Sequence, residues 1–390
     1  MKQLNLTCLF LSLLLMTISC KRTKISGSSS GAQNGAWILR ASLPTGVAMG
    51  ESATFTVNNA AYVATGINPQ TPNQKLTAMY KYTAAPASSE SQAAWDSAYG
   101  VWTQVQSFPG QARSNAVAFN IGSSTGYLGA GLANDNVTAL ADFYAYNPTT
   151  NTWSSIDSIH NDTASFARYD AVAFSFDTTA YVLTGTNGQY YFGDVWRYSP
   201  TANTWIREVN YPGSPRSGAV GLVYHGQGYL VTGFTPGSKW AEGSLCYDFW
   251  RFTPGSDTSV NNWVRLDDIY PTGGGSFDAA YTDIIRDHAV GFTILGQPDG
   301  DKGYITTGSN GGTDITSTWE YDFASDRWTA KTPFSGTPRT GAVGFTLAGN
   351  VPSTMGAAAT RGFIATGLNL GASAAFSDCD EFFPNLADSK

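Results

Sequence analysis

The chain has 390 residues, a formal net charge of −7 and a pI near 4.9. An acidic chain of this kind argues against a broad nucleic-acid interface, which needs concentrated lysine and arginine. Charged residues make up 13% of the chain, about half the usual share. The 42 glycines and 13% aromatic residues suit many short strands joined by tight turns, so composition favours an all-β protein.

The N-terminal residues predict an export signal. An apolar run over 9–16, preceded by a lysine, is too short to span a bilayer. The segment Thr17-Ile-Ser-Cys20 follows it and resembles the lipobox of bacterial lipoproteins, although Thr17 stands where leucine is preferred. We therefore expect lipid attachment at Cys20. An ordinary secretory signal cut near the same place is the alternative.

The resulting division is a signal peptide over 1–19, a Ser- and Gly-rich tether over 20–34, and a folded domain over 35–390. The protein would cross the inner membrane and stay in the cell envelope, by expectation at the outer membrane. The lipid anchor would be its only contact with the membrane. One acyl chain binds marginally, so stable attachment implies several chains. Export also excludes cytosolic nucleic-acid partners.

The domain consists of a repeated unit that opens at an arginine. A segment Arg-x-x-Ala-Val is followed by an aromatic run ending in glycine, then by an alternating stretch and a closing tryptophan. The units open at Met49, Arg113, Arg168, Arg216, Arg286 and Arg339, with Met49 replacing the arginine once. The closing tryptophans are Trp37, Trp102, Trp153, Trp205, Trp263 and Trp328.

Each unit predicts four short strands, because its runs are β-branched or aromatic and end at Gly, Pro, Asn or Asp. Repeated four-stranded units are typical of β-propeller blades. The last unit ends without a tryptophan, and the missing strand stands at the other end, around Trp37. We therefore predict a six-bladed propeller whose last blade is closed by residues 35–40. This closure hides two sheet edges, whereas an open solenoid would not need the returning strand.

The order of arginine, Tyr-x-x-x-Gly, aromatic strand and closing tryptophan resembles that of Kelch repeats, over about nine-tenths of the chain. Kelch units usually carry a Gly-Gly doublet after the second strand, and here single glycines such as Gly185 and Gly233 occupy that place. The resemblance implies an all-β, six-bladed Kelch-type β-propeller without indicating a particular subfamily.

The repeated arginines are the candidate ligand-binding residues. The first strand of a propeller blade lines the axis, so five guanidinium groups are expected near one mouth. An Arg cluster binds carboxylates bidentately, and some Kelch adaptors hold acidic peptides with arginines at this position. The alternative is that each arginine hydrogen-bonds carbonyls of the neighbouring blade and serves assembly only. The candidates are Arg113, Arg168, Arg216, Arg286 and Arg339.

Other polar residues give weaker signals. The third strand carries a repeated aspartate, which is expected to accept backbone N–H groups or pair with the arginine. The three histidines come from different blades without metal-ligand spacing, and the Cys–Tyr context of Kelch-like copper oxidases is missing, so no metal or cofactor is predicted. Cys246 and Cys379 are expected to be free and buried. The aspartates are Asp142, Asp194, Asp248 and Asp378, and the histidines are His160, His225 and His288.

Three functions fit these observations. The first is an envelope-anchored, monomeric binding module that recognises a glycan or an acidic peptide through the propeller mouth or its loops. Aromatic loop residues suit glycan stacking, and they are Trp95, Tyr190, Tyr191 and Trp240. The second is a sugar-acid mutarotase similar to the six-bladed Kelch epimerases, with a Glu or His moving protons. The third is a scaffold in an envelope complex. The scarcity of His and of a recurrent Glu favours binding over catalysis, and no catalytic residue is assigned.

Overall fold

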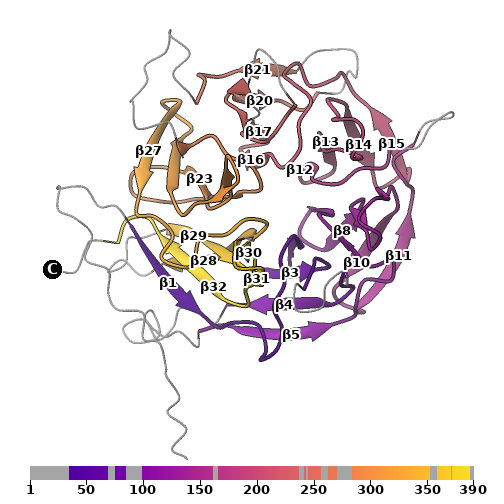
Figure 1. Ribbon diagram of the computed structural model, residues 1–390, viewed down its shortest axis with the longest axis horizontal. Coiled ribbons are helices and arrows are strands. Elements are labelled where there is room, and N and C mark those ends of the chain that lie inside the picture. The colour runs from indigo at the N-terminus through magenta and orange to yellow at the C-terminus, as the bar shows by residue number, and fades with distance from the viewer. Residues whose placement is uncertain are drawn as a thin grey trace, which may run out of the picture.

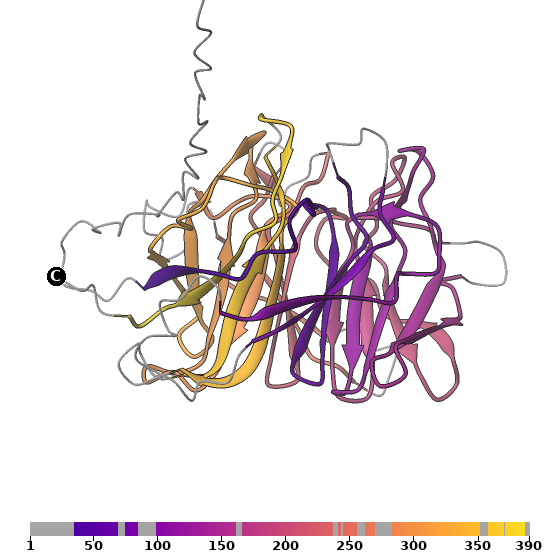
Figure 2. The same cartoon turned by 90° about the horizontal axis from the view of Figure 1, so that it is seen from below.

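The computed structural model confirms the predicted propeller. The elements in the described part of the chain are all strands, arranged as six four-stranded antiparallel sheets and four small two-stranded sheets. The six sheets stand around a central axis (Figure 1), and seen edge-on the strands run between the two faces of the ring (Figure 2). The structure describes residues 35–68, 75–84, 99–160, 166–236, 241–242, 245–255, 262–269, 283–351, 358–369 and 371–386.

The predicted signal peptide over 1–19 and tether over 20–34 lie outside the described residues. Within the part of the chain that the structure describes, no helix is long and apolar enough to cross a membrane.

Each of the first five blades is one stretch of chain, with its strands in sequence order from the axis to the rim. Blade 1 has β2 (Ala53–Val57), β3 (Ala60–Ala64), β4 (Met79–Thr83) and β5 (Val101–Val105). Blade 2 has β7 (Val117–Ile121), β8 (Thr125–Gly129), β10 (Phe143–Asn147) and β11 (Thr152–Ile156). Blade 3 has β12 (Val172–Ser175), β13 (Ala180–Leu183), β14 (Val195–Ser199) and β15 (Thr204–Arg207).

The remaining blades follow the same plan. Blade 4 has β16 (Val220–Tyr224), β17 (Gln227–Val231), β20 (Trp250–Phe252) and β21 (Trp263–Arg265). Blade 5 has β22 (Val290–Ile294), β23 (Lys302–Thr306), β26 (Thr318–Asp322) and β27 (Arg327–Lys331). Blade 6 has β28 (Val343–Val351), β29 (Ala358–Ala365), β32 (Cys379–Phe383) and β1 (Ala36–Arg40). The small sheets pair β6 (Arg113–Ser114) with β9 (Leu132–Ala133), β18 (Ala241–Glu242) with β19 (Leu245–Cys246), β24 (Ser309–Asn310) with β25 (Thr313–Asp314), and β30 (Leu368–Asn369) with β31 (Ala374–Ala375).

The N-terminal strand closes the ring as predicted. Strand β1 is the outer strand of blade 6 and pairs antiparallel with β32, from Ala36 opposite Phe383 to Arg40 opposite Cys379 (Figure 1). Trp37 of β1 packs on Phe382 with ring centroids 4.6 Å apart. Because β1 covers the edge of β32, the last blade has the same four strands as the others.

A buried ionic cluster fixes this closure. The Glu381 carboxylate on β32 accepts from Arg40 Nε of β1 at 2.7 Å and from Arg361 Nη2 of β29 at 2.6 Å. Glu381 and Arg40 are 0% and 1% exposed. Removing one partner from such a buried group leaves an uncompensated charge, so the cluster favours the register in which all three side chains meet.

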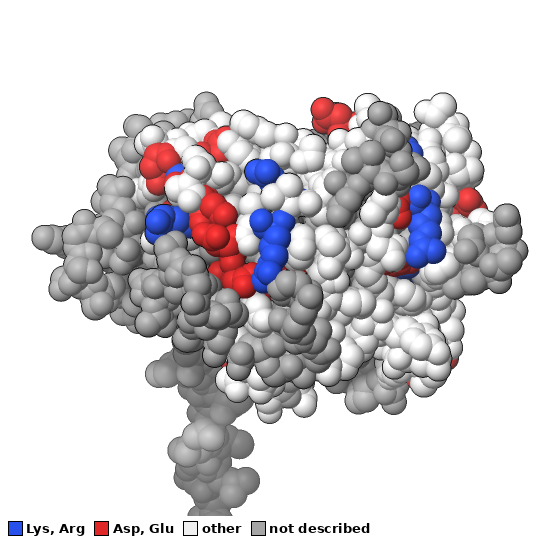
Figure 3. All heavy atoms as spheres, turned by 90° about the horizontal axis from the view of Figure 1, so that it is seen from above, with Lys and Arg blue, Asp and Glu red and all other residues white. Residues whose placement is uncertain are grey.

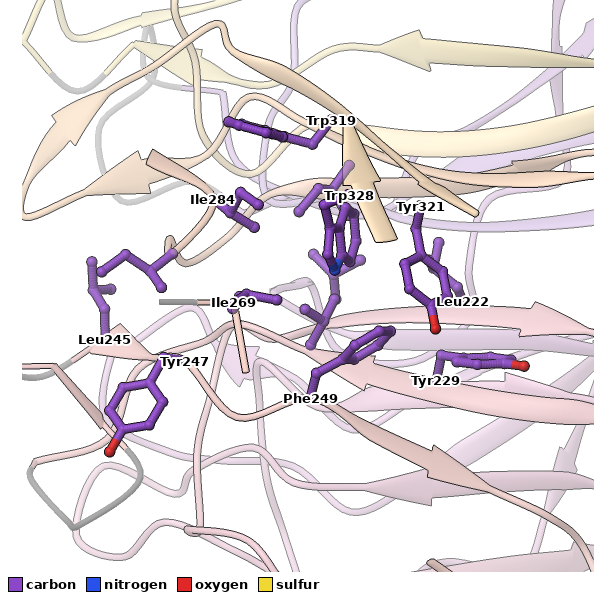
Figure 4. Close-up of a cluster of buried hydrophobic side chains, with 14 residues drawn as sticks. Leu222, Tyr229, Leu245, Tyr247, Phe249, Ile269, Ile284, Trp319, Tyr321 and Trp328 are labelled. Carbon is purple, nitrogen blue, oxygen red and sulfur yellow. The ribbon is translucent and has the colours of Figure 1, made fainter. Parts of the chain in front are cut away.

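The hydrophobic core consists of six clusters, one between each pair of neighbouring blades. In the cluster between blades 4 and 5, Phe249 meets Tyr321 edge-on with ring centroids 4.8 Å apart, and Trp328 lies 5.6 Å from Phe249 (Figure 4). Aromatic side chains thus join blades that share no backbone strand pairing.

The repeated tryptophans join neighbouring blades at the rim, which explains their spacing. In four of them the indole Nε1 donates to a backbone carbonyl that follows the outer strand of the preceding blade. The donor–acceptor pairs are Trp37–Thr332, Trp102–Ala41, Trp153–Gln106 and Trp205–Asp157. Trp205, for example, is 8% exposed and belongs to the core between blades 2 and 3.

The outer surface carries few charges. Figure 3 shows one side of the ring, where the described surface is mostly uncharged and small groups of acidic and basic residues lie beside one another. This pattern agrees with the charged share of 13% in the sequence. Among the described residues on this side of the ring, no single-sign surface of the kind that binds a polyanion is seen.

Candidate functional site

The five repeated arginines lie inside the blades and are 0–1% exposed. The Nε atom of each donates to the carbonyl of the residue two positions earlier. Nη1 donates to the carbonyl of the residue directly before the constant glycine that follows the second strand. In blade 5, Arg286 also donates to Ser317 Oγ at 2.7 Å. In the other four blades the guanidinium binds the third-strand aspartate, in the pairs Arg113–Asp142, Arg168–Asp194, Arg216–Asp248 and Arg339–Asp378.

This geometry does not form the anion site expected of Arg113, Arg168, Arg216, Arg286 and Arg339. Burial separates these groups from solvent, and carbonyls, carboxylates or a hydroxyl of the same blade already accept from their N–H groups. The arrangement agrees with an architectural role, but the acceptors belong to the arginine's own blade and not to the neighbouring blade as expected. A ligand site must therefore use other residues.

The constant glycine of each unit joins one blade to the next. Its N–H donates to the carbonyl of the arginine, or of Met49, in the following blade at 2.7–3.0 Å. The glycine has a φ of +90 to +109°, which glycine adopts without a side-chain clash. The repeat therefore specifies a backbone connection between blades, and the six donors are Gly66, Gly131, Gly185, Gly233, Gly308 and Gly367.

A second circuit of backbone hydrogen bonds surrounds the axis, two residues after each arginine. Each blade contributes one residue with a left-handed φ of 48–61°. Its N–H donates to the carbonyl of the equivalent residue in the preceding blade at 2.7–3.1 Å, and the sixth bond closes the circle. We call these the axial residues, and they are Glu51, Asn115, Asp170, Gly218, His288 and Gly341.

The axial residues place polar side chains from different blades in one location. Two of the six positions are glycine, and these positions make room for larger neighbours. A Cβ on Gly218 would lie 2.9 Å from the imidazole of His288, and a Cβ on Gly341 would lie 3.1 Å from Glu51 Cγ. The left-handed conformation is common for Asn, Asp and His but unusual for Glu. Strained backbone that persists is often associated with a functional site.

His288 bridges two carboxylates from different blades. Its Nε2 lies 3.2 Å from Asp170 Oδ2 in blade 3, and its Nδ1 lies 3.0 Å from Asp287 Oδ1 in blade 5. Burial lowers the pKa of His288, but charge and hydrogen bonding from Asp170 and then Asp287 outweigh it and raise this pKa well above the usual value. The imidazole is therefore a cation at neutral pH.

Glu51 lies on the other side of the axis. Its Oε2 accepts from Asn115 Nδ2 at 3.2 Å. Burial raises the pKa of Glu51 and the charge of Asp170 adds to the rise, whereas Ser114, His288 and Lys75 lower it. Lys75 is 4% exposed and its Nζ donates to Leu132 O at 3.1 Å. A buried lysine thus partly offsets the acidic groups.

Tyr191 adds an aromatic ring to this cluster. Burial raises the pKa of its phenol, and the nearby Asp170 and Asp287 raise it further, while a hydrogen bond with Ser217 lowers it. The ring centroid lies 6.0 Å from that of Phe234. Of the predicted aromatic loop residues, Tyr191 therefore lies close enough to the axial Asp170 for its charge to act on the phenol. Tyr190 is 60% exposed, and Trp95 and Trp240 lie outside the described residues.

The remaining predicted candidates do not join this cluster. His160 and His225 have exposed side chains, at 52% and 71%. Cys246 and Cys379 are free and buried, as expected. Among the described residues, no group of three or more His, Cys, Asp or Glu side chains is arranged to hold a metal ion.

Sequence reasoning missed the axial residues because it searched for what repeats. Across the six units this position reads Glu, Asn, Asp, Gly, His and Gly, and only its spacing from the arginine is constant. That spacing is the usable signal, because a propeller brings equivalent positions of all blades to one axis.

Comparison with known proteins agrees with this architecture. A family model described as "Kelch motif" matches residues 167–210, which contain all four strands of blade 3. A search of curated proteins found no match. Among solved structures 413 chains match, so the fold is common and does not by itself choose a function.

One solved structure, titled "Structure of YjhT", has a TM-score of 0.59 and 17% sequence identity. The match covers 86% of this chain and 95% of that chain. At this identity the likeness shows the fold alone. Together with the circular order of the blades, it shows a six-bladed β-propeller that carries a Kelch motif in blade 3.

Proposed function

We propose that the protein is a carbohydrate-binding module of the cell envelope and that its axial cluster binds a neutral glycan. The observation that supports this best is the pair of carboxylates, Asp170 and Asp287, that lie 3.2 and 3.0 Å from the ring nitrogens of His288. The charges of both carboxylates also act on the phenol of Tyr191. Aromatic faces pack on the apolar face of a sugar ring. A few converging polar groups orient such a ligand, and carboxylates accept hydrogen bonds from its hydroxyls.

The charges of the cluster favour a neutral ligand over an acidic one. Among the described residues, the cations whose charge acts on the carboxylates of Glu51, Asp170 and Asp287 are His288 and Lys75. The repeated arginines, which would attract an acidic peptide, are buried in their own ion pairs. Of the two ligand classes expected from the sequence, we therefore propose the glycan.

Binding is tested with a glycan array followed by calorimetric titration of each hit. Tyr191→Ala and Asp170→Asn should each weaken binding about ten-fold or more, because they remove a stacking surface and a charged acceptor. Tyr190→Ala is the matched control, since Tyr190 is adjacent in sequence but 60% exposed. No glycan binding by the wild type, or equal losses in Tyr190→Ala and Tyr191→Ala, would contradict the proposal and leave the scaffold hypothesis.

A mutarotase is the second candidate, because the axial cluster contains groups suited to proton transfer. His288 is a cation at neutral pH, and the raised pKa of Glu51 brings this carboxyl closer to the range of a general acid or base. Exchange NMR on the anomers of a bound sugar tests this function. Catalysis requires faster interconversion with the wild type and a loss of that acceleration in Glu51→Gln. Binding without acceleration supports the module alone.

We further propose that the propeller is attached to a membrane through lipid on Cys20. The sequence Thr17-Ile-Ser-Cys20 supports this attachment. Cys20→Ala should move the protein from the membrane fraction to the soluble periplasmic fraction, as measured by fractionation and immunoblotting. A wild-type protein that is already soluble after cell breakage would contradict lipid anchoring, and the proposal for the axial cluster would be unaffected.

A further inference from the structure

The position of His288 depends on a missing side chain in the neighbouring blade. His288 starts in blade 5 and reaches Asp170 in blade 3, so its imidazole passes over blade 4 at Gly218. A Cβ there would lie 2.9 Å from His288 Nδ1 and 2.9 Å from Cε1, closer than side chains tolerate. Glycine at this single position therefore permits the bridge.

The bridge uses both donors of the imidazolium. Nε2 and Nδ1 engage one oxygen each of Asp170 and Asp287, at 3.2 and 3.0 Å. Among the residues that the structure describes, the second oxygens, Asp170 Oδ1 and Asp287 Oδ2, accept no side-chain hydrogen bond. The side chains of Asp170, Asp287 and His288 are 10%, 18% and 30% exposed, so the unit is sheltered but open to a ligand.

A second observation on the same cluster indicates unused hydrogen-bonding capacity. The Ser114 side chain is 0% exposed, and its hydroxyl has no hydrogen-bond partner of normal geometry although Glu51 is close enough to be affected by it. A buried hydroxyl without a partner costs free energy. The axial cluster therefore contains a buried hydroxyl whose hydrogen-bonding capacity is not fully used.

We propose that Asp170 and Asp287, held apart by His288 over Gly218, form a paired acceptor for two adjacent hydroxyl groups of the sugar, and that His288 is its positioning residue. This inference rests on the proposed carbohydrate-binding function and deepens it. The two free carboxylate oxygens accept a hydrogen bond from each hydroxyl group, and the charges of the same carboxylates act on the Tyr191 phenol. The unit therefore selects sugars that present a vicinal diol.

The pH dependence follows from the groups that face His288. Asp170 comes from blade 3, Asp287 from its own blade and Glu51 from blade 1, with Lys75 beyond Glu51. Because the folded-state pKa of His288 is raised, the bridge is complete below the ordinary histidine pKa and is lost as pH rises through the raised value. Sugar binding should weaken over that alkaline interval.

The ligand-free test uses histidine-selective isotope labelling and NMR titration. The chain has three histidines, and the exposed His160 and His225 give reference signals. His288 should titrate at higher pH than both, and Asp170→Asn and Asp287→Asn should each move its titration to lower pH. A His288 that titrates together with the exposed pair would overturn the bridge, whatever the protein binds.

The ligand test uses the methyl glycosides of the array hits and their monodeoxy analogues. Loss of either hydroxyl of the vicinal pair should weaken binding by the wild type roughly ten-fold, since an acceptor then lacks its donor. His288→Asn, which keeps a residue that tolerates left-handed φ, should weaken binding of the parent sugar and remove its alkaline pH dependence. Asp287→Asn serves as a second variant that leaves the axial backbone unchanged.

The outcomes separate the two proposals. If the wild type binds sugars but deoxy analogues bind equally well and His288→Asn keeps the pH profile, the paired acceptor is overturned while carbohydrate binding stands. If the wild type binds no sugar, both proposals fail, even where the NMR titration shows a bridged His288.

Discussion

Two positions at the start of each blade, with one residue between them, have opposite properties. The arginine position is nearly constant and buried, and its side chain binds groups of its own blade. The axial position, two residues later, varies between blades and has side chains directed at other blades, as in the pair His288–Asp170. The constant position maintains the symmetry of the ring, whereas the variable position breaks it. An asymmetric ligand requires the second kind of position.

The comparison also applies within the arginine position. Blade 1 has Met49 where the other blades have arginine, and Ala78 where four of them have aspartate. Met49 is 0% exposed and packs in the core between blades 6 and 1. A hydrophobic residue thus serves in the place of a buried ion pair, as expected if the pair is structural.

The largest effect on stability is expected from opening the ring, which tests whether the repeated contacts between blades are sufficient without closure by β1. Removing residues 21–42 deletes β1, exposes the edge of β32 and takes Arg40 from the buried Glu381. We expect aggregation or a large fall in Tm, measured by scanning calorimetry and light scattering. Removing 21–34 alone is the control and should leave Tm unchanged. Equal melting of both truncated chains would contradict closure by β1.

The next effect compares the same substitution in two blades. Arg216→Met leaves Asp248, which is 0% exposed, without its cation and should cost about 3–5 kcal/mol. Arg113→Met should cost less, roughly 1–3 kcal/mol, because the Asp142 side chain is 37% exposed and water can solvate it. Denaturant titration measures both. Equal losses, or a folded Arg216→Met that has lost only sugar binding, would return the arginines to the ligand site.

A smaller effect is expected at an axial glycine. Gly218→Ala combines a φ of +61° with a contact 2.9 Å from the His288 ring, and should cost about 2 kcal/mol. Gly226→Ala has a φ of +73° and no atom within 4 Å, so it should cost only the backbone strain of about 1 kcal/mol. Thermal unfolding of the two variants separates strain from contact. The prediction fails if Gly226→Ala is the more damaging change.

The smallest effect should be a gain in stability. The pKa of Glu51 is raised by burial and then by Asp170, so its ionised form is disfavoured in the folded protein. Glu51→Gln should therefore raise Tm slightly at neutral pH, with the difference disappearing as pH falls below the ordinary glutamate pKa of about 4. Sugar binding should weaken in the same variant because a charged acceptor is lost.

Asp135→Asn is the control for that measurement, because its change in Tm at neutral pH should have the opposite sign. Hydrogen bonds from the side chain and backbone of Thr138 lower the pKa of Asp135 to about 2. Its contribution to stability is present above the ordinary aspartate pKa and is lost as pH falls towards 2. The variant should therefore lower Tm at neutral pH and match the wild type in acid. A fall in Tm for Glu51→Gln at neutral pH would contradict the assignment of Glu51 as a disfavoured charge.

The architecture was predictable from the sequence because it is specified six times. Trp205 and its equivalents mark the rim, and Gly185 and its equivalents mark the connection between blades, so an error at one unit is corrected by the others. The closing strand was predictable for the same reason, since Trp37 is the one closing residue that stands at the wrong end of the chain.

The candidate site could not be predicted from the residues that repeat. His288 looks isolated in the sequence, and its partner Asp170 lies two blades earlier along the chain. The contact depends on the angle between blades and on the small residue at Gly218, neither of which a repeat pattern encodes. The sequence placed the ligand-binding hypothesis on the repeated arginines because their pattern is strong. In a symmetric fold, however, a residue that repeats in nearly every blade is one that assembly of the blades requires.

The closure of blade 6 has a consequence for the order of folding. Arg40 and Glu381, which meet in the finished ring, are 341 residues apart in the chain. Contacts of such high sequence separation form late, because the loop between them must first be ordered. During synthesis β1 is made before the other described strands, and its partner β32 is made after them. The apolar side chains of β1 therefore remain unpaired while the first five blades are synthesised. A binding partner that shields residues 35–40 in that interval would therefore act as a folding factor.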